Sequence, residues 1–249
     1  MKLLDLTLPS PAENVALDEA LLDAAEADAG QGEVLRLWEP PIATEGIPYS
    51  GHFVVAGRST KIEVEVDLAA CRRRGVSVLR RSSGGAAIVA GPGCLMYAVV
   101  LSYERRPQLR MLDQAHVYVL SKVAEAVGRL GLEVHPRGTS DLVWGERKIS
   151  GNSLRCKRDH FVYHGTLLYD FDLPLIGELL RSPPRQPQYR GGRSHGEFLA
   201  NLPASAGELR HAIAEVFGAS EPLGEWPRER TLDLAAGRYG REEWNLRGK

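Results

Sequence analysis

Residues 76–103 read VSVLRRSSGGAAIVAGPGCLMYAVVLSY, and this stretch decides what kind of fold the chain adopts. Three apolar runs of strand length predict β-strands at 76–79, 86–90 and 95–103. A turn is predicted between the last two runs, where Gly91, Pro92 and Gly93 follow one another. A polar loop with adjacent glycines joins the first two. The centre of the chain is therefore predicted to be β-sheet.

On either side of this stretch, apolar residues recur with the spacing of strands or of amphipathic helices. Further strands are predicted at 34–38, 53–56, 142–144, 147–150 and 161–169. Helices are predicted at 14–29 with Gly30 as its cap, between Asp67 and Gly75, and at 114–130, 175–180, 197–201 and 206–217. Because strands dominate the middle and helices surround it, the prediction is an α+β fold, a mixed β-sheet core flanked by helices.

The chain has 249 residues, of which 43% are hydrophobic and 25% charged, as in an ordinary globular protein. This length predicts one domain over 1–249, with 220–249 as a short C-terminal extension and no large accessory domain. The net charge of −1 disfavours nucleic acid and anionic membranes as partners. No apolar run approaches the roughly 18 residues of a membrane span.

The three cysteines, Cys71, Cys94 and Cys156, make neither a CxxC pair nor an even disulfide framework. Together with an N-terminus that lacks the apolar core of a signal peptide, this predicts a reducing, cytoplasmic location. Cys94 is expected to be a buried packing residue, and Cys156 to lie at a hairpin tip.

The loop from Arg80 to Gly85 is the first candidate for chemistry. Adjacent glycines let a backbone approach a ligand closely, and their N–H groups are suited to an anion. The two arginines, Arg80 and Arg81, are suited to phosphate or carboxylate. The loop is neither a Walker phosphate loop nor a dinucleotide fingerprint. The alternative is a glycine bulge with solvated arginines.

Two later segments carry the other candidates. In residues 138–153, Lys148 is suited to act as a point charge on a carbonyl or phosphate oxygen. Asp141 in the same segment is suited to a divalent metal or a ligand amine. His164 lies in a predicted strand that also contains a glycine. The alternatives are an ordinary polar hairpin for the first segment and a structural histidine for the second.

Taken together and in this order, the three segments resemble the lipoate-protein ligase A family, which has a biotin/lipoate protein ligase catalytic domain. The resemblance rests on RRxSGG at 80–85, Asp141, KxSG at 148–151 and HGTLL at 164–168, with weaker matches at 14–19 and 54–58. It covers roughly residues 10 to 175.

The resemblance implies an enzyme that activates lipoate or octanoate with ATP and Mg²⁺ as an acyl-adenylate. The acyl group then passes to a lysine of a lipoyl domain or another lipoate-carrier protein. It implies that Lys148 is the catalytic residue and that Asp141 helps to hold phosphate or Mg²⁺. The substrate and nucleotide residues that it implies are Arg58, Arg81, Ser83, Gly84, Gly85, Ala86, Asp141, Ser150, Gly151, Ser153, His164 and Thr166.

The chain departs from the family pattern at three places. Ala86 replaces the third loop glycine, which bears on the acyl chain that the site accepts. The other departures, Ser140 in place of asparagine and the residues around Gly91 to Cys94, bear on the nucleotide contacts.

Two other readings of the function stay open at this point. One is an octanoyl or lipoyl transferase that works through a cysteine thioester, although neither Cys94 nor Cys156 stands at a family cysteine position. The other is a non-catalytic or partner-dependent subunit of a two-part ligase, with an accessory subunit as partner. In that case Arg185, Arg190 and Arg193 are candidates for docking an acidic lipoyl domain. A biotin ligase is disfavoured because the GRGRxGR loop is absent.

Overall fold

The computed structural model describes residues 1–27, 32–40 and 51–247. Within these residues the strands form a large sheet in the order β11-β1-β2-β6-β10-β9-β8-β7 and a small sheet in the order β4-β3-β5. The strands are β1 Lys2–Asp5, β2 Val34–Trp38, β3 Phe53–Ala56, β4 Ser77–Arg80, β5 Ile88–Ala90, β6 Cys94–Ser102, β7 Val134–Arg137, β8 Asp141–Trp144, β9 Arg147–Cys156, β10 His160–Leu168 and β11 Glu221–Pro222.

Both sheets mix parallel and antiparallel neighbours. In the large sheet β1 runs parallel to β2 and β11. Every other pair of neighbours in this sheet is antiparallel, in the order β2, β6, β10, β9, β8, β7. In the small sheet β3 is parallel to β4 and antiparallel to β5. The α+β prediction, with a mixed sheet between helices, is therefore confirmed.

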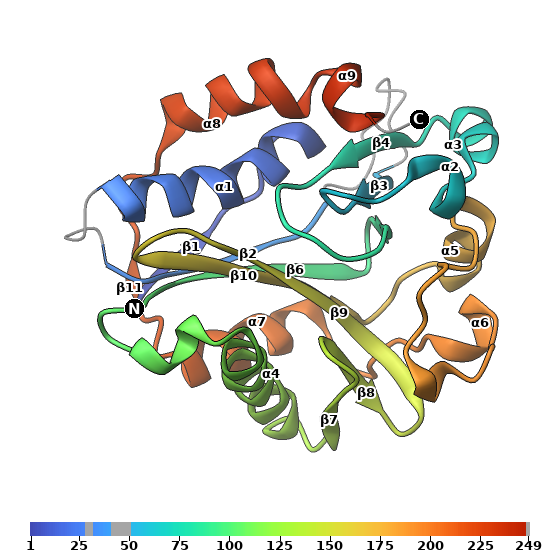
Figure 1. The fold of residues 1–249 in the computed structure, drawn as a ribbon. Coiled ribbons are helices and arrows are strands. Elements are labelled where there is room, and N and C mark those ends of the chain that lie inside the picture. The colour runs from blue at the N-terminus through green and yellow to red at the C-terminus, as the bar shows by residue number, and fades with distance from the viewer. Residues whose placement is uncertain (28–31, 41–50, 248–249) are drawn as a thin grey trace.

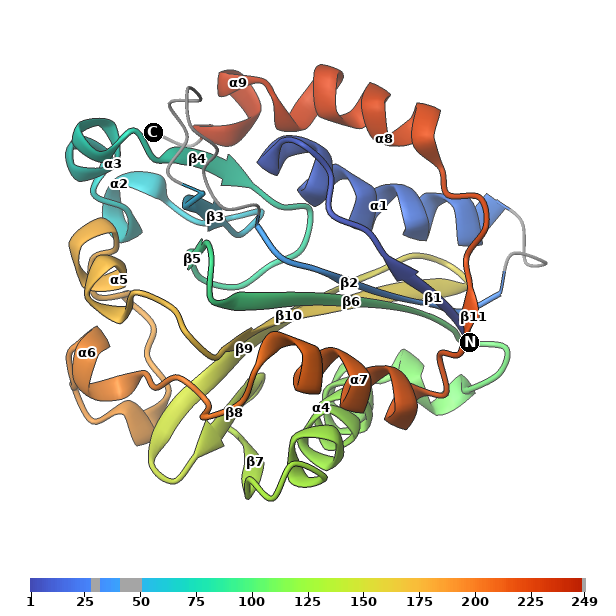
Figure 2. The ribbon, with the colours of Figure 1, turned by 180° about the vertical axis from the view of Figure 1, so that it is seen from behind.

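Helices cover both faces of the large sheet (Figure 1). They are α1 Pro11–Ala27, α2 Ile62–Glu65, α3 Leu68–Arg74, α4 Leu112–Gly128, α5 Leu173–Leu179, α6 His195–Phe198, α7 Ala206–Phe217, α8 Arg228–Leu234 and α9 Glu242–Asn245, with shorter turns η2 Pro107–Arg110, η3 Gln188–Arg190 and the π-helical η4 Ala235–Tyr239. Figure 2 shows α4 and α7 on one face, and α1 and α8 on the other. No helix among the described residues is long and apolar enough to cross a membrane.

The alternation of side chains along β6 explains the two helical layers. Leu95, Tyr97, Val99 and Leu101 belong to the core cluster that includes α4 and α7. The intervening Ala98 and Val100 belong to the cluster that includes α1. Because successive residues of a strand point to opposite faces, a strand buried on both sides is apolar throughout.

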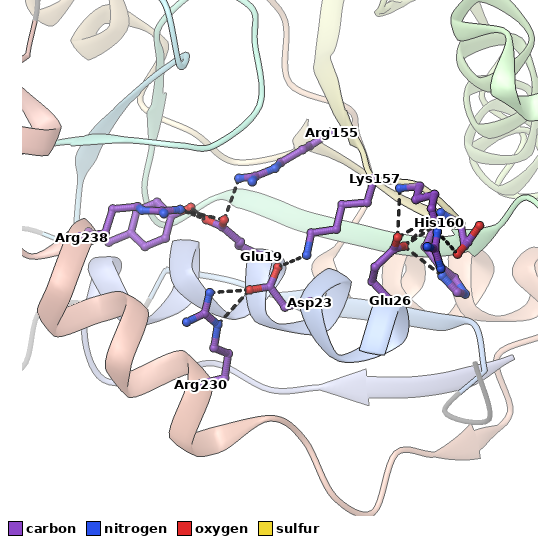
Figure 3. A network of polar contacts seen from close by, with 11 residues as sticks. Glu19, Asp23, Glu26, Arg155, Lys157, His160, Arg230 and Arg238 are labelled. Atoms are coloured by element: carbon purple, nitrogen blue, oxygen red, sulfur yellow. Dashed lines mark hydrogen bonds and ion pairs between the residues drawn. The ribbon is translucent and has the colours of Figure 1, made fainter. Parts of the chain in front are cut away.

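Acidic side chains along α1 fasten two other parts of the chain to this helix. Figure 3 shows Glu19 and Asp23 between basic residues in or just after β9 and basic residues of the C-terminal helices, and Glu26 beside His160. Each ion pair has a nitrogen–oxygen distance of 2.7 Å, and they are Arg155–Glu19, Arg238–Glu19, Lys157–Asp23 and Arg230–Asp23. The segment 228–247 is thereby held against α1.

Most predicted elements lie where the pattern placed them, with informative differences at their ends. Helix α1 begins at Pro11, before the predicted residue 14, because Ser10 and Glu13 form reciprocal hydrogen bonds and Pro11 suits the first turn. The predicted cap Gly30 lies outside the described residues. Strand β9 continues well past residue 150. The sequence pattern did not predict β1, β7, β11, α2, α8, η4 or α9.

Candidate active site

A cavity of about 400 Å³ lies between β9, β10, the loop that follows β4, and the segment 183–198. It is large enough for a small organic ligand. The predicted site residues on its wall are Arg81, Gly85, Ala86, Asp141, Lys148, Gly151, Ser153, His164 and Thr166. The three sequence segments singled out above therefore meet around one space.

Lys148 and Asp141 form an ion pair inside this cavity. The ammonium Nζ lies 2.7 Å from Asp141 Oδ1, and the hydroxyl of Tyr189 donates to Asp141 Oδ2 at 2.7 Å. The hairpin of β8 and β9 brings the lysine and aspartate together, with a register shift between Leu142 and Val143. A Cβ on Gly151 would lie 3.1 Å from Lys148 Nζ, so the glycine of the KxSG pattern leaves room for the lysine.

The glycine loop is held in place by Arg81, whose guanidinium is buried. Nε donates to Ser83 Oγ at 3.0 Å, Nη1 donates to the carbonyl of Val55 at 3.0 Å, and Nη2 donates to that of Ala86 at 3.0 Å. Burial lowers the pKa of Arg81 to about 10. Because its donors are directed at the chain's own oxygens, Arg81 shapes the cavity wall as well as lining it.

Arg80 does not take the ligand-binding place that the sequence suggested for it. Its side chain is buried and donates to the carbonyls of Gly57 at 2.8 Å, Thr60 at 2.9 Å and Arg247 at 2.7 Å. Asn245 Oδ1 accepts from the Arg80 backbone N–H at 3.0 Å. The side chain therefore ties the C-terminal segment to the base of the glycine loop, and phosphate pairing is not its role in this structure.

His164 joins α1 to the glycine loop through a chain of hydrogen bonds. Its Nε2 lies 2.6 Å from Ser83 Oγ, and its Nδ1 lies 3.2 Å from Asp18 Oδ2. An ionised carboxylate such as that of Asp18 can only accept a hydrogen bond. We therefore expect neutral His164 to carry its hydrogen on Nδ1, facing Asp18, with Nε2 accepting from Ser83.

Asp18 at the end of that chain is kept ionised. Burial alone would raise the pKa of the Asp18 carboxyl, but the His164 hydrogen bond and the charge of Arg36 outweigh it and leave the pKa lowered. Arg36 Nη1 lies 2.7 Å from Asp18 Oδ1. The resemblance named the segment 14–19 without assigning Asp18 a role, so this residue was missed.

Asn152 is a second residue that the predictions missed. Its Oδ1 accepts from the Tyr97 hydroxyl, and its Nδ2 donates to the carbonyl of Ser140 at 2.8 Å. A Cβ on Gly165 would lie 1.7 Å from Asn152 Oδ1, which explains the glycine of the HGTLL strand. The asparagine stood within the segment 138–153, whereas nothing in the sequence pointed to Tyr97.

Four predicted residues do not line the cavity. Arg58 is exposed and its backbone N–H donates to the Ser83 carbonyl at 2.8 Å. Ser83 and Ser150 are buried, and Ser150 Oγ accepts from Asn152 at 3.0 Å. Gly84 is exposed, and its carbonyl accepts from Ser153 Oγ at 3.0 Å. These positions support the wall from behind or lie at its rim.

The basic loop that begins at Pro183 is more buried than its composition suggested. Arg185 is exposed and lines the cavity. Arg190 is only 3% exposed, and Arg193 donates to the carbonyls of Glu146, Tyr189 and Arg190. Arg190 is therefore inaccessible to a docking protein in this structure, which corrects that part of the docking hypothesis.

Asp141 is the residue that the sequence suggested as a metal ligand. Both oxygens of Asp141 already accept hydrogen bonds, and across 1–27, 32–40 and 51–247 no three His, Cys, Asp or Glu side chains are grouped to hold a metal ion. The residues present do not make a protein-held magnesium site. Asp141 as a ligand of nucleotide-bound Mg²⁺ stays a prediction.

The three cysteines, all of which lie in the described part of the chain, are absent from the cavity wall. Burial raises the pKa of Cys94 well above its usual value and that of Cys71 to about 11. Cys156 is exposed at the end of β9, beside the turn to β10, as predicted. Cys94 is fully buried, also as predicted.

Comparisons with known proteins agree with this arrangement. A protein from Aeropyrum pernix named as a lipoate-protein ligase A is 30% identical over 178 residues, which are 72% of this chain and 61% of that protein. The octanoyltransferase LipM of Geobacillus kaustophilus is 26% identical, over 95% of this chain and 94% of its own. The chain thus spans less than two thirds of the first relative and nearly all of the second.

Solved structures share the fold over the whole chain. The structure described as a bi-partite lipoate protein ligase from Thermoplasma acidophilum superposes with a TM-score of 0.82 at 24% identity, covering 100% of this chain and 96% of that one. The sequence profile described as Lipoyl protein ligase A/B catalytic domain matches residues 10–217. That match covers most of the sequence, including Lys148, the glycine loop and His164, and so this chain belongs to the lipoyl protein ligase A/B catalytic domain family.

Proposed function

We propose that this chain is a lipoate-protein ligase that activates lipoate or octanoate with ATP and transfers the acyl group to a lysine of a lipoyl domain. The observation that carries the proposal is the position of Lys148 in a cavity shared with the glycine loop. We further propose that residues 1–249 form one catalytic domain.

In the first step a carboxylate oxygen of the acid attacks the α-phosphorus of ATP, and pyrophosphate leaves. In the second step the acceptor lysine attacks the acyl carbonyl, and AMP leaves. Negative charge accumulates on phosphate and then carbonyl oxygens, and a fixed ammonium stabilises it in both steps. Asp141 fixes that ammonium at 2.7 Å. Magnesium, when bound with the nucleotide, would neutralise phosphate charge.

The remaining wall divides by polarity in a way that suits both halves of an acyl-adenylate. Apolar side chains of Val15, Trp38, Val55, Ile88 and Met96 line one part of the cavity, which we assign to the acyl chain. Ala86 also lines the cavity, and we propose that its methyl group narrows the acyl part. The backbone of Gly85 and the side chains of Ser153, His164 and Thr166 are assigned to polar contacts.

The transferase alternative requires a cysteine that can reach the acyl carbonyl. The relative from G. kaustophilus is named an octanoyltransferase. Against it in this chain stand the burial of Cys71 and Cys94 and the exposed place of Cys156, with none of the three on the cavity wall. This supports the adenylate route.

The partner-dependent alternative has its own support. The T. acidophilum protein of similar fold is described as part of a bi-partite ligase, with an E2 lipoyl domain. An accessory subunit and a lipoyl domain are therefore the partners that we propose to test first.

The test is acyl transfer by the purified chain with lipoate, ATP, Mg²⁺ and a lipoyl domain, followed by intact-mass spectrometry. A mass increase by one lipoyl group that depends on ATP supports the proposal, and octanoate is run in parallel. Modification without ATP from an octanoyl-carrier protein would make the chain a transferase. Modification only after an accessory subunit is added would make it one part of a two-part ligase.

A further inference from the structure

Arg190 is a buried cation on the cavity wall, and the proposed function above gives it no role. It ends the short turn η3, between Pro187 and Gly191, and is 3% exposed. Its guanidinium carbon lies 4.9 Å from the ring centre of Phe198, which lines the same cavity. Nε donates to the carbonyl of Arg193 at 2.9 Å. These contacts fix where the guanidinium lies.

The other end of this guanidinium is not satisfied. Nη2 of Arg190 is buried and has no hydrogen-bond partner. A buried donor without an acceptor destabilises a protein, the more so when it is charged. Native structures therefore seldom keep one unless a ligand completes it.

The surroundings of Arg190 identify the kind of ligand that would complete it. Burial first, and then the charges of Arg190 and Lys148, lower the pKa of His195 to about 4, so both cations act on one place. Lys148 is ion-paired with Asp141, whereas Arg190 Nη2 has no partner. A planar guanidinium matches the oxygens of a phosphate or carboxylate, and the excess of positive charge favours an anion.

We infer that Arg190 is an anion-binding residue of this cavity and that its Nη2 donates to a phosphate oxygen of the nucleotide. The inference rests on the proposed function, because ATP is the substrate that supplies the phosphate. It makes Arg190, together with Lys148, a cation of the site that contacts phosphate. Its burial excludes the alternative of a surface for an acidic protein.

The experiment is calorimetric titration of the full-length chain with AMP, inorganic pyrophosphate and adenosine, in wild type and in Arg190→Gln. The variant should bind the phosphate-bearing probe about tenfold or more weakly, the loss expected for a charge-assisted hydrogen bond. Adenosine, which carries no phosphate, should bind equally. Weaker AMP binding assigns the contact to the α-phosphate, and weaker pyrophosphate binding alone assigns it to the departing phosphates.

Arg147→Gln is the matched control. Arg147 is exposed near the same cavity, does not line it, and donates to the carbonyl of Gly196 at 3.0 Å. It should leave all three affinities unchanged. Arg190→Lys keeps the charge without the planar fork and should lose part of the affinity.

A readout in the wild-type chain does not depend on any variant folding. AMP or pyrophosphate, whichever is bound at Arg190, should raise the pKa of His195 above about 4, as followed by NMR with each probe. A His195 pKa that neither probe moves, or equal phosphate affinities in wild type and Arg190→Gln, overturns the assignment of Arg190 alone. A wild-type chain that binds neither ATP nor any phosphate probe overturns the proposed function instead.

Discussion

The ammonium of Lys148 lies 2.7 Å from the carboxylate of Asp141 inside the cavity, and the ammonium of Lys157 lies 2.7 Å from Asp23 outside it. The two ion pairs have the same chemistry and the same length. Both lysines come from β9 or the residue that follows it. Comparing variants of the two lysines therefore separates the contribution of an ion pair to stability from the contribution of a cation to catalysis.

We expect Lys148→Ala to lower the rate of acyl transfer by about 10²-fold or more, because the loss of a preorganised charge is felt in the transition state. Lys157→Ala should leave the rate unchanged. Steady-state transfer assays on both variants, with urea unfolding as a check on stability, provide the comparison. Equal rates in the two variants would remove Lys148 from the mechanism.

The hydrogen-bond chain through His164 makes a prediction about a proton. Neutral His164 should carry its hydrogen on Nδ1, facing Asp18, with Nε2 accepting from Ser83. Nitrogen NMR shifts of the imidazole distinguish this form from the other. Protonation on Nε2 alone would contradict the proposed order of donors.

Removing the serine hydroxyl should then loosen the glycine loop. Ser83→Ala leaves Arg81 Nε and His164 Nε2 without their shared partner, at a cost of about 1–3 kcal/mol in the free energy of unfolding. Ser59→Ala, at an exposed serine of the neighbouring turn, is the control and should leave the free energy of unfolding unchanged. Urea denaturation measures both, and equal midpoints would mean that the hydroxyl is dispensable.

The C-terminal segment should stabilise the fold through buried polar contacts more than through its ion pairs. Asn245→Ala removes the acceptor of the Arg80 N–H and the donor to the Tyr239 carbonyl, both buried, and should cost about 1–3 kcal/mol. Arg230→Ala breaks an exposed pair with Asp23 and should cost about 0–1 kcal/mol. Thermal melting of the two variants tests the order, and the reverse ranking would contradict it.

Stability should fall as the pH drops below about 6.5, and His195 is one cause. Its pKa is about 4 in the folded chain, against about 6.5 when unfolded. Between these values the unfolded chain binds the proton and the folded chain does not, so acid favours unfolding. Asp18, whose pKa is lowered in the fold, adds to the loss at still lower pH, because its contribution is present only above its unfolded pKa.

Urea midpoints of wild type and His195→Gln at several values between pH 7.5 and 5 test this expectation. The variant should lose less stability than wild type over that interval because glutamine does not titrate. Parallel curves would show that His195 is not the group responsible.

Cys156→Ala should leave acyl transfer at the wild-type rate, since Cys156 is exposed and does not line the cavity. The same assay used for Lys148 measures it. A loss of about tenfold or more would revive the thioester route in place of the adenylate.

Local sequence patterns predicted much of this molecule. Strand and helix periods, the Asp67 and Gly75 caps and the 142–150 hairpin depend on neighbouring residues, and the structure has all of them. The motifs around Lys148 and the glycine loop were also visible, because each is contiguous. The helices α8 and α9 were missed, since both are short and the residues that hold them lie far away in the sequence: Leu234 belongs to the core cluster of Val15, and Asn245 contacts Arg80.

Only the tertiary structure decided which polar groups meet. Asp18 lies 146 positions from His164, and Arg80 lies 165 from Asn245, distances over which no local period acts. The adjacent Arg80 and Arg81 therefore contact different parts of the chain. Arg80 donates to the C-terminal segment, and Arg81 donates to the glycine loop. A buried donor takes whichever acceptor the packing brings to it, and that choice is made by the folded chain as a whole.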